Sequence, residues 1–496
     1  MEYFLNLEFI KFDIIAAISD ALWTYIVITM LVGCALYFTW NLRGVQFTML
    51  PTMLKNLRPS PRLSLVGRGA DTDKRVEGDD VTTPLPTRER WGEGLSISSF
   101  QAFAISLSSR VGTGNLAGVA SAIFVGGPGA VFWMWVMALL GASTAFMEAT
   151  LAQLFKRHGK DSFYGGPAYY MKYGLKQPWM GILFAFLIIY GFGLANQLVQ
   201  SNTLCDALSN TFHVPMKYVA GGLALMTLLI IFGGIQRIAR FCAMVVPFMA
   251  IGYILLALYI LAVNFTQIPA MLSLIVKSAF GWEQAAGGAV GIAIMQGVKR
   301  GLFSNEAGEG SAPNAAATAT IPHPVYQGLL QSLGVFTDTL VICTCTAFII
   351  LLSGLYDCGD DGIILTGHAM EHHLGSFGGW FLLAAIFLFA YSTIIANYFY
   401  GETNIRYITG KPWAVTLFRL LSGVMVLLGG FMTLQQAWGI VDLAMALMTI
   451  TNLIAVLLLS RYAFRLLKDF KEQRSKGKEP TFNPSLFPEA DLEGWT

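Results

Sequence analysis

The sequence has 496 residues, of which 55% are hydrophobic and 12% are charged. An ordinary soluble domain has roughly 25% charged residues, so this composition excludes a soluble protein. The 32 Lys and Arg residues nearly balance the 30 Asp and Glu residues, and the net charge of +2 leaves no basic excess for nucleic acid. Long unbroken apolar runs predict an all-α polytopic membrane protein rather than a β-barrel.

A helix that spans a membrane needs about 20 mostly apolar residues. Segments of this kind recur along the chain and predict eleven transmembrane helices, at 22–41, 95–124, 130–155, 181–207, 217–234, 242–263, 285–310, 327–353, 377–400, 413–433 and 438–460. Two of them, 95–124 and 285–310, differ from the rest, because they are rich in Gly, Ser and Asn and are interrupted by charged residues.

Lys and Arg residues in short loops predict the orientation, since cytoplasmic loops carry most of them. The loops 42–94 and 156–180 and the tail 461–496 are rich in Lys and Arg, whereas the loop 354–376 contains neither. The N-terminus is therefore expected outside and the C-terminus in the cytoplasm, which agrees with eleven spans. Residues 45–94 are expected to form a polar cytoplasmic linker.

A glycine-rich patch, RVGTGNLAG at 110–118, interrupts the second predicted span. A broken helix offers a half-helix N-terminus to a carboxylate and unwound carbonyl groups to a small cation. Small side chains also let a ligand approach the backbone. The alternative is that these glycines only allow close packing of neighbouring helices.

A second patch, KRGLFSNEAGEGSAPN at 299–314, interrupts the seventh predicted span in the same way. Arg110 precedes Asn115 by five residues, and Arg300 precedes Asn305 by five. Paired interrupted helices at matching positions of two halves point to the central binding site of a transporter. The second patch therefore favours a ligand site over packing alone.

The runs GTGNLAG, GGPGAVFWMWVMALLGASTAFMEA and GLFSNEAGEGSAPNAAATA resemble the alanine or glycine:cation symporter family of prokaryotes. The resemblance covers most of the chain and implies a leucine-transporter-like fold, with one extra N-terminal helix before a 5+5 inverted-repeat core that contains two broken helices. The implied divisions are 1–44 for the extra helix, 95–263 and 264–460 for the two repeats, and 461–496 for a cytoplasmic tail.

The resemblance also implies roles for individual residues. Backbone N–H groups would bind the substrate carboxylate, a pocket would surround the rest of the substrate, and carbonyl and hydroxyl oxygens would bind sodium, since oxygen ligands suit a hard cation. The implied substrate-binding residues are Gly112, Thr113, Gly114, Asn115, Gln200, Ser304, Asn305, Gly308 and Trp438. The implied sodium ligands are Ser108, Val111, Asn115, Ser392 and Thr393.

Charged residues inside predicted spans are functional candidates. Asp338 is a candidate sodium ligand or gate residue. Glu148 is expected to form a structural ion pair with Lys156 or Arg157, two turns further along. Glu306 and Glu309 are expected to pair with Arg300 or Arg110 as structural or gating pairs.

Three alternative functions remain open from the sequence. A proton-coupled carrier of the same fold would use Glu306 or Asp338. A membrane zinc protease would use His368, Glu371 and His372, which match the motif H-x-x-E-H, although a third ligand is not evident. A transporter-like nutrient sensor would signal through the linker. All six histidines are expected in loops, which argues against a buried histidine proton relay.

The preferred hypothesis is a sodium-coupled symporter of a bacterial inner membrane that imports alanine or glycine by alternating access. Its expected partners are a small neutral amino acid, Na⁺ as the coupling ion and the lipid bilayer. We expect no enzymatic activity, no cofactor and no nucleic-acid partner.

Overall fold

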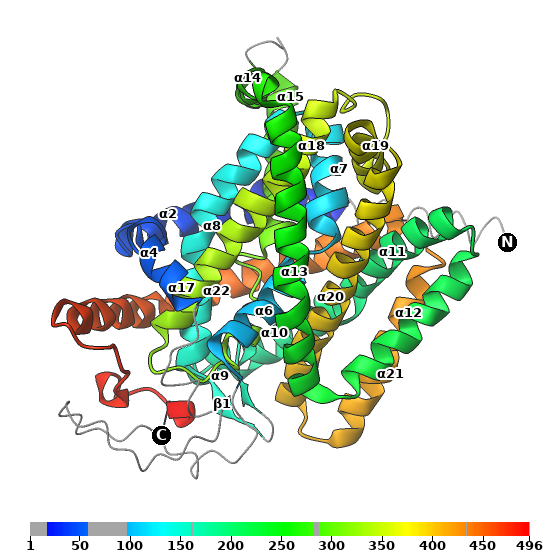
Figure 1. Ribbon diagram of the computed structural model, residues 1–496. Helices are drawn as coiled ribbons and strands as arrows, with labels where there is room; N and C mark the ends of the chain where they lie inside the picture. The colour runs from blue at the N-terminus through cyan, green and yellow to red at the C-terminus, as the bar shows by residue number, and fades with distance from the viewer. Residues whose placement is uncertain (1–16, 58–96, 160–161, 282–286, 433, 496) are drawn as a thin grey trace, which may run out of the picture.

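The computed structural model describes residues 17–57, 97–159, 162–281, 287–432 and 434–495, and they fold almost entirely into helices (Figure 1). Up to α14, the elements are η1 Leu22–Val27, α2 Ile28–Asn41, α3 Val45–Thr48, α4 Leu50–Asn56, α6 Ser99–Arg110, η3 Gly114–Gly118, α7 Val119–Gly126, α8 Gly129–Leu154, β1 Arg157–His158, β2 Phe163–Tyr164, α9 Pro167–Tyr173, α10 Pro178–Tyr190, η4 Gly191–Ala195, α11 Asn196–Phe212, α12 Met216–Ile231, α13 Gly234–Val263, η5 Phe265–Gln267 and α14 Ile268–Phe280. The remaining elements are α15 Gly287–Asn305, α16 Pro313–Ala316, α17 Val325–Val335, η6 Phe336–Cys343, α18 Thr344–Ser353, α19 Gly362–Leu374, α20 Ser376–Ile408, α21 Pro412–Gly429, α22 Leu434–Ser475, η7 Pro484–Leu486 and η8 Glu493–Trp495.

Eight helical segments among the described residues are long and apolar enough to cross a membrane. They are Ala17–Asn41, Gly129–Leu154, Pro178–Phe212, Gly234–Val263, Val325–Ser353, Ser376–Ile408, Pro412–Gly429 and Val441–Ser475. The other three predicted spans correspond to the interrupted α6–α7, to the shorter α12 and to α15. The count of eleven therefore stays a prediction.

The outer helix α13 carries a long apolar face that no part of the described chain covers. Met244, Phe248, Ile251 and Leu255 follow one another at helical spacing and expose between 58% and 74% of their surface. A continuous exposed apolar face is unfavourable in water and favourable in hydrocarbon. This face and the eight apolar segments identify a multi-pass membrane protein.

The two glycine-rich patches coincide with the two interruptions of helical structure. The first helix, α6, begins at a capping box between Ser98 and Gln101, and its regular turns end at Val111, where ψ is 84°. The second, α15, ends at Asn305, and the chain then takes positive φ values of 55° at Glu306 and 101° at Gly308 before α16 begins. Both breaks are buried in the protein, where surrounding side chains satisfy the freed backbone groups.

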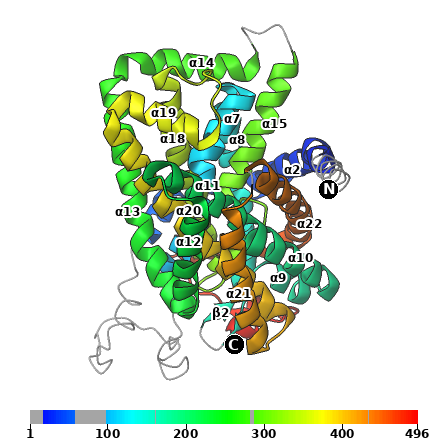
Figure 2. The same ribbon diagram turned by 90° about the vertical axis from the view of Figure 1, so that its right-hand side faces the viewer.

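Two helices form where the sequence predicted loops. The helix α14 lies across one end of the molecule between α13 and α15 (Figure 2). The helix α19 lies within the predicted loop 354–376 and is capped by Asp361, whose side chain accepts the N–H of Gly362 at 2.5 Å. Three histidines, His368, His372 and His373, lie on α19, so the prediction that all six lie in loops was wrong.

The C-terminal segment is ordered against the rest of the protein. The helix α22 continues to Ser475, beyond the predicted span end at 460. The segment after it folds back onto the β1–β2 hairpin, where Arg157 binds Asp491 at 2.7 Å, and the Trp495 indole donates to the carbonyl oxygen of Gln153 at 2.9 Å. The tail therefore joins the end of α22 to the C-terminal end of α8.

Candidate functional site

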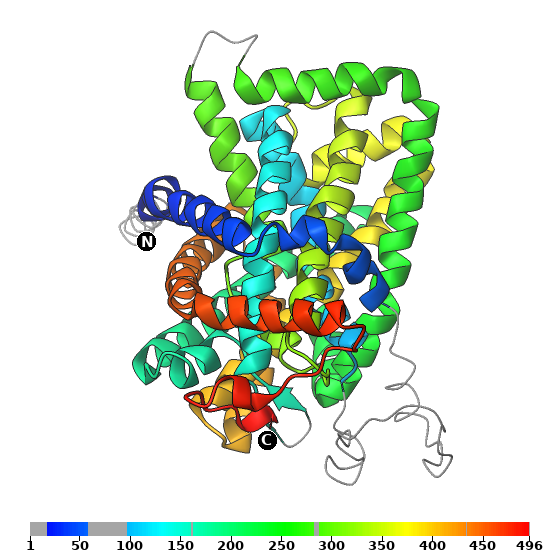
Figure 3. The same ribbon diagram turned by 90° about the vertical axis from the view of Figure 1, so that its left-hand side faces the viewer.

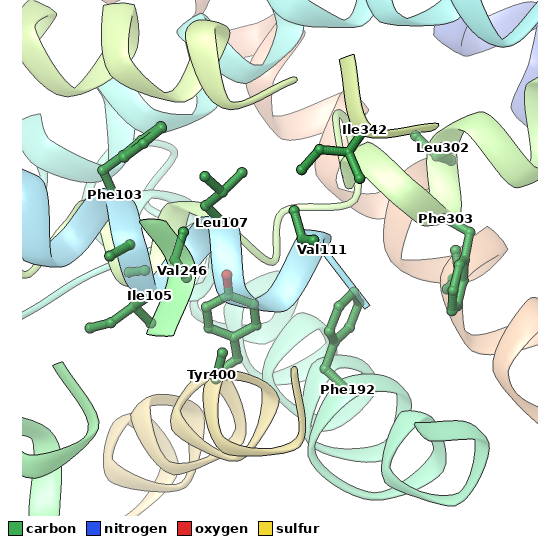
Figure 4. Close-up of a cluster of buried hydrophobic side chains, with 14 of the residues drawn as sticks. Phe103, Ile105, Leu107, Val111, Phe192, Val246, Leu302, Phe303, Ile342 and Tyr400 are labelled. Atoms are coloured by element: carbon green, nitrogen blue, oxygen red, sulfur yellow. The ribbon is translucent and has the colours of Figure 1, made fainter. Parts of the chain in front are cut away.

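The first interruption lies between helices from distant parts of the chain. Figure 4 shows the rings of Phe192 and Tyr400 projecting from neighbouring helices toward the end of α6, which carries Leu107 and Val111. The Phe192 and Tyr400 rings are 5.9 Å apart. These aromatic rings keep water away from the backbone groups that the interruption leaves without helical hydrogen bonds. Those groups therefore need polar side chains as partners.

The Thr393 hydroxyl of α20 lies among the last carbonyl groups of α6. Its Oγ1 is 2.7 Å from the carbonyl oxygen of Ser108 and 3.3 Å from that of Val111. It also contacts the carbonyl oxygen of Phe389, one turn earlier in α20, at 3.0 Å. Several oxygen atoms therefore converge at one buried point, which is the chemistry that a small hard cation requires.

The neighbouring hydroxyl of Ser392 points elsewhere. Its Oγ lies 3.8 Å from the sulfur of Met249 on α13 and 3.1 Å from the carbonyl oxygen of Phe389. Of the two hydroxyl residues assigned to sodium, the structure therefore places Thr393 against the α6 carbonyls and Ser392 against α13.

Amide side chains hold the N–H groups of the unwound segment. The Thr113 N–H donates to Gln200 Oε1 at 3.1 Å, and the Gly112 N–H donates to Asn115 Oδ1 at 2.9 Å. A Cβ at Gly112 would lie 2.6 Å from Thr393 Oγ1, so glycine is required for this approach. The Thr113 Oγ1 is buried and has no hydrogen-bond partner among the described residues.

A second polar cluster joins the two broken helices. The Asn115 amide donates to Asp338 Oδ1 at 2.7 Å and to Ser304 Oγ at 3.2 Å, and Ser304 donates to Asp338 Oδ2 at 2.5 Å. The sulfur of Cys343 contacts both Asn115 and Ser304. Three predicted site residues from three separate helices therefore meet here, and two of them, Asn115 and Ser304, bind the buried carboxylate of Asp338.

The predicted residue Gly114 lies where the two broken helices touch. A Cβ at this position would lie 2.7 Å from Cδ1 of Phe303. The absence of a side chain is thus required by packing, whatever else the segment binds. Its role in carboxylate binding stays a prediction.

Two other predicted residues of the second break face different neighbours. Asn305 Oδ1 accepts the N–H of Ala307 at 3.0 Å, which closes the end of α15. The Gly308 N–H donates to Glu148 Oε2 at 3.2 Å, and its carbonyl oxygen accepts from the Asn452 amide at 2.9 Å. Gly308 therefore contacts α8 and α22. The side chain of Trp438 lies outside the part of the chain that the structure describes.

The expected ion pair of Glu148 with Lys156 or Arg157 was wrong. Glu148 binds the Asn452 amide and the Gly308 N–H rather than Lys156 or Arg157. Lys156 and Arg157 lie just after the C-terminal end of α8 and bind Gln153 and Asp491. Glutamates are short, and the two turns between Glu148 and its expected partners place them beyond reach.

The expected pairs of Glu306 and Glu309 with Arg110 or Arg300 are a separate case, because Arg110 interacts electrostatically with both carboxyl groups. Glu306 accepts hydrogen bonds from Ser109 and Ser311, and neither carboxyl oxygen of Glu309 has a hydrogen-bond partner among the described residues. Arg300 pairs with Asp442 at 3.6 Å, and Arg110 donates to the carbonyl oxygen of Gln331 at 3.3 Å.

Sequence reasoning missed the residue that links the first break to α20. The Ser109 hydroxyl contacts Glu306 and lies 2.6 Å from Asn397 Oδ1. A signal was available, since Asn397 follows Thr393 by four residues and so lies on the same face of α20. Through Ser109, the polar face of α20 is therefore linked to both breaks.

The zinc motif does not form a metal site in the described residues. His368 binds Asp360 at 2.7 Å, and no group of three His, Cys, Asp or Glu side chains suited to a metal ion occurs in the described ranges. The hydrogen bonds from His368 and from Cys358 lower the pKa of Asp360. His368 therefore pairs with a carboxylate at the start of α19, and the H-x-x-E-H match is part of an exposed helix.

A buried histidine lies at the other end of the molecule, between α16 and α17. His323 Nδ1 accepts the N–H of Val325, and Nε2 lies 3.2 Å from Asp469 Oδ2. Burial lowers the pKa of His323 to about 4, since the charged imidazolium is poorly solvated there. The ring is therefore neutral at physiological pH, with its proton on Nε2.

Comparisons with known proteins give matches along almost the whole chain. The family model of the sodium:alanine symporter family matches residues 8–67 and 81–484. The probable sodium/glutamine symporter GlnT of Bacillus subtilis (strain 168) is 46% identical over 472 residues, which cover 95% of this chain and 92% of that protein. The sodium/proton-dependent alanine carrier protein of Bacillus sp. (strain PS3) is 38% identical over 80% of this chain and 94% of that protein.

A solved structure matches the fold. The crystal structure of MhsT in complex with L-phenylalanine has a TM-score of 0.51 at 14% sequence identity, over 76% of this chain and 90% of that one. This likeness confirms the leucine-transporter-like fold that the sequence motifs implied.

Proposed function

Because the chain belongs to the sodium:alanine symporter family, we propose that it imports a small neutral amino acid, alanine or glycine, together with Na⁺. Its relatives are symporters and carriers, so it is a transporter and not an enzyme. The observation that carries the sodium part of the proposal is the convergence of Thr393 Oγ1 with the carbonyl oxygens of Ser108 and Val111.

Sodium binds at this point in the proposed mechanism. Two carbonyl oxygens at the end of α6 and one hydroxyl of α20 would supply hard oxygen ligands to the ion from two helices. Binding there draws the broken helix against α20. The Asp338 carboxylate, with Asn115 and Ser304, adds a negative charge near the second break that favours a cation in the same region.

The substrate carboxylate binds the unwound segment next to the ion. It replaces the Gln200 and Asn115 oxygens as acceptor of the Thr113 and Gly112 N–H groups. The free hydroxyl of Thr113 supplies a further donor, which supports this location because buried polar groups normally have partners. Tight packing around Gly112 favours a small amino acid.

Transport proceeds by alternating access across the membrane. The helices α6–α7, α8, α15–α16 and α17–α18 rock against α10–α11, α12, α20 and α21. Sodium completes the substrate site, so each ligand strengthens binding of the other, typically by about 1–3 kcal/mol. The inward sodium gradient then drives amino-acid uptake.

The proposed orientation places the N-terminus outside and the C-terminus in the cytoplasm of a bacterial inner membrane. The Lys and Arg residues of 42–57, of the β1–β2 hairpin and of the α22 end support it. The interrupted α6–α7, the short α12 and α15 cross the bilayer as well, which gives eleven spans.

A single uptake experiment tests the function. Purified protein in proteoliposomes is given labelled alanine with an inward sodium gradient, with an inward proton gradient, or with neither. We expect accumulation with the sodium gradient alone and competition by unlabelled glycine. Accumulation that needs only a proton gradient would show that the carrier is coupled to protons and not to sodium. The buried carboxyl group of Glu309 would then be the first candidate for the proton-binding residue. Competition by glutamine but not by glycine would contradict the proposed substrate.

A further inference from the structure

A basic cavity lies where the chain after α2 meets the far end of α22. Its volume is about 510 Å³, and it is lined by Arg43, Thr48, Met49, Thr52, Lys471 and Arg474. Figure 3 shows α2–α4, in blue, running beside the red end of α22. The cavity therefore joins two segments that are more than 400 residues apart, as the Arg474–Thr52 contact illustrates.

The lining combines three positive charges with two hydroxyl groups and contains no carboxylate. The Arg474 guanidinium donates to Thr52 Oγ1 at 2.6 Å. Within the described part of the chain, no carboxylate forms an ion pair with Arg43, Lys471 or Arg474. Three cations gathered without a counter-charge repel one another and attract an anion.

The backbone holds Arg43 at this position. Arg43 and Gly44 have φ values of 55° and 60°, both in the left-handed region. A non-glycine residue in this conformation costs about 1–2 kcal/mol, so its surroundings must impose it. The turn directs the chain from α2 into α3 and places Arg43 beside the end of α22.

The segments that line the cavity also expose apolar side chains. Trp40 exposes 85% of its surface, and Phe47 and Leu54 expose 50% and 54%. Trp40 lies in the last turn of the apolar helix α2, and Phe47 and Leu54 lie on α3 and α4. Aromatic residues at the end of a span mark the interface between hydrocarbon and headgroups. Basic residues at the cytoplasmic end of a span, beside such an apolar face, suit the phosphate of an anionic lipid.

We propose that this cavity binds the phosphate of an anionic phospholipid, whose acyl chains lie along the exposed apolar face of α2–α4. Arg43 approaches the phosphate from one segment, and Lys471 and Arg474 approach it from the other. The lipid thereby joins the N-terminal helix to the end of α22. A free phosphate ion would neutralise the same charges but would leave the exposed apolar side chains of α2–α4 uncovered.

Thermal stability of the full-length protein in a neutral detergent tests the proposal. The probes are phosphatidylglycerol, phosphatidylcholine with the same acyl chains, and inorganic phosphate. We expect phosphatidylglycerol to raise the melting temperature at much lower concentration than phosphatidylcholine, and inorganic phosphate to have little effect. Equal effects of the two lipids would overturn the headgroup site, and an equal effect of inorganic phosphate would overturn the lipid as its occupant.

Two variants locate the effect. Each removed cation is expected to weaken phosphatidylglycerol binding roughly fivefold, so Arg43→Gln with Arg474→Gln should weaken it about 25-fold. The matched control is Lys468→Gln, because Lys468 is exposed on the same helix, lies 3.8 Å from Glu472 and does not line the cavity. Equal weakening in the control would show diffuse surface attraction and overturn the site.

A measurement on the unaltered protein covers the case in which the double variant does not fold. Native mass spectrometry of the protein released from mixed-lipid vesicles should retain phosphatidylglycerol in preference to phosphatidylcholine. Retention in proportion to the vesicle composition would overturn the proposal.

Discussion

The replacement Thr393→Val tests whether the hydroxyl of α20 is a sodium ligand. Valine keeps the shape and branching of threonine, so the change removes one oxygen atom without opening a cavity. That oxygen lies 2.7 Å from the carbonyl oxygen of Ser108 and 3.3 Å from that of Val111. Loss of one polar partner at a buried site costs about 1–3 kcal/mol. The sodium concentration for half-maximal binding should therefore rise roughly 5- to 150-fold.

Sodium-dependent alanine uptake in proteoliposomes measures this change, and sodium-induced thermal stabilisation of the purified protein checks it without transport. Ser392→Ala is the matched control, because its hydroxyl faces Met249 on α13 and should leave sodium dependence unchanged. Thr393→Ser, which retains the hydroxyl, should restore most of the affinity. An unchanged sodium dependence in Thr393→Val, or an equal shift in Ser392→Ala, would refute the assignment.

Three further predictions follow from particular contacts. Gly114→Leu places atoms within 2.7 Å of the Phe303 ring, so it should lower the free energy of unfolding by about 1–3 kcal/mol. It should also abolish the stabilisation by alanine. A full alanine-induced thermal shift in this variant would place the substrate elsewhere. Cys358 is exposed and the other five cysteines are buried, so an impermeant maleimide should label intact cells at this residue, and labelling only after lysis would reverse the proposed topology. Burial lowers the pKa of His323 to about 4, whereas the unfolded chain takes up this proton near pH 6.5. The free energy of unfolding should therefore fall by about 1 kcal/mol per pH unit as the pH is lowered from 6 to 4. The same dependence of melting temperature on pH in His323→Gln would contradict this.

Composition and local pattern were sufficient for the coarse architecture. The apolar runs predicted a helical membrane protein, and the two glycine-rich patches lie where the helices α6 and α15 end. Both signals are local, because a backbone that must leave the helical conformation needs small residues at that position. The helices α14 and α19 were missed, since neither is long or apolar enough to resemble a span.

Contacts between distant segments were beyond a sequence pattern. Helical spacing shows that Ser392 and Thr393 point about 100° apart, but it does not show which one faces α6. The approach of Asn452 to Glu148 joins residues 304 positions apart, and a nearby lysine in the sequence suggested a different partner. Residue types thus indicated the chemistry of the site, whereas the pairing of those residues depended on the packing of whole helices.

The ion pair between the C-terminal tail and the β1–β2 hairpin has a consequence for biosynthesis. Arg157 and Asp491 are separated by 334 residues. At about 5–20 residues per second, the ribosome needs roughly 20–70 s to make the carboxylate after the arginine. During that interval Arg157 is an unpaired cation beside a newly inserted helix, which is the state in which positive charge directs membrane orientation. In the proposed orientation, the same side chain would act first as an insertion signal and later as half of a structural ion pair.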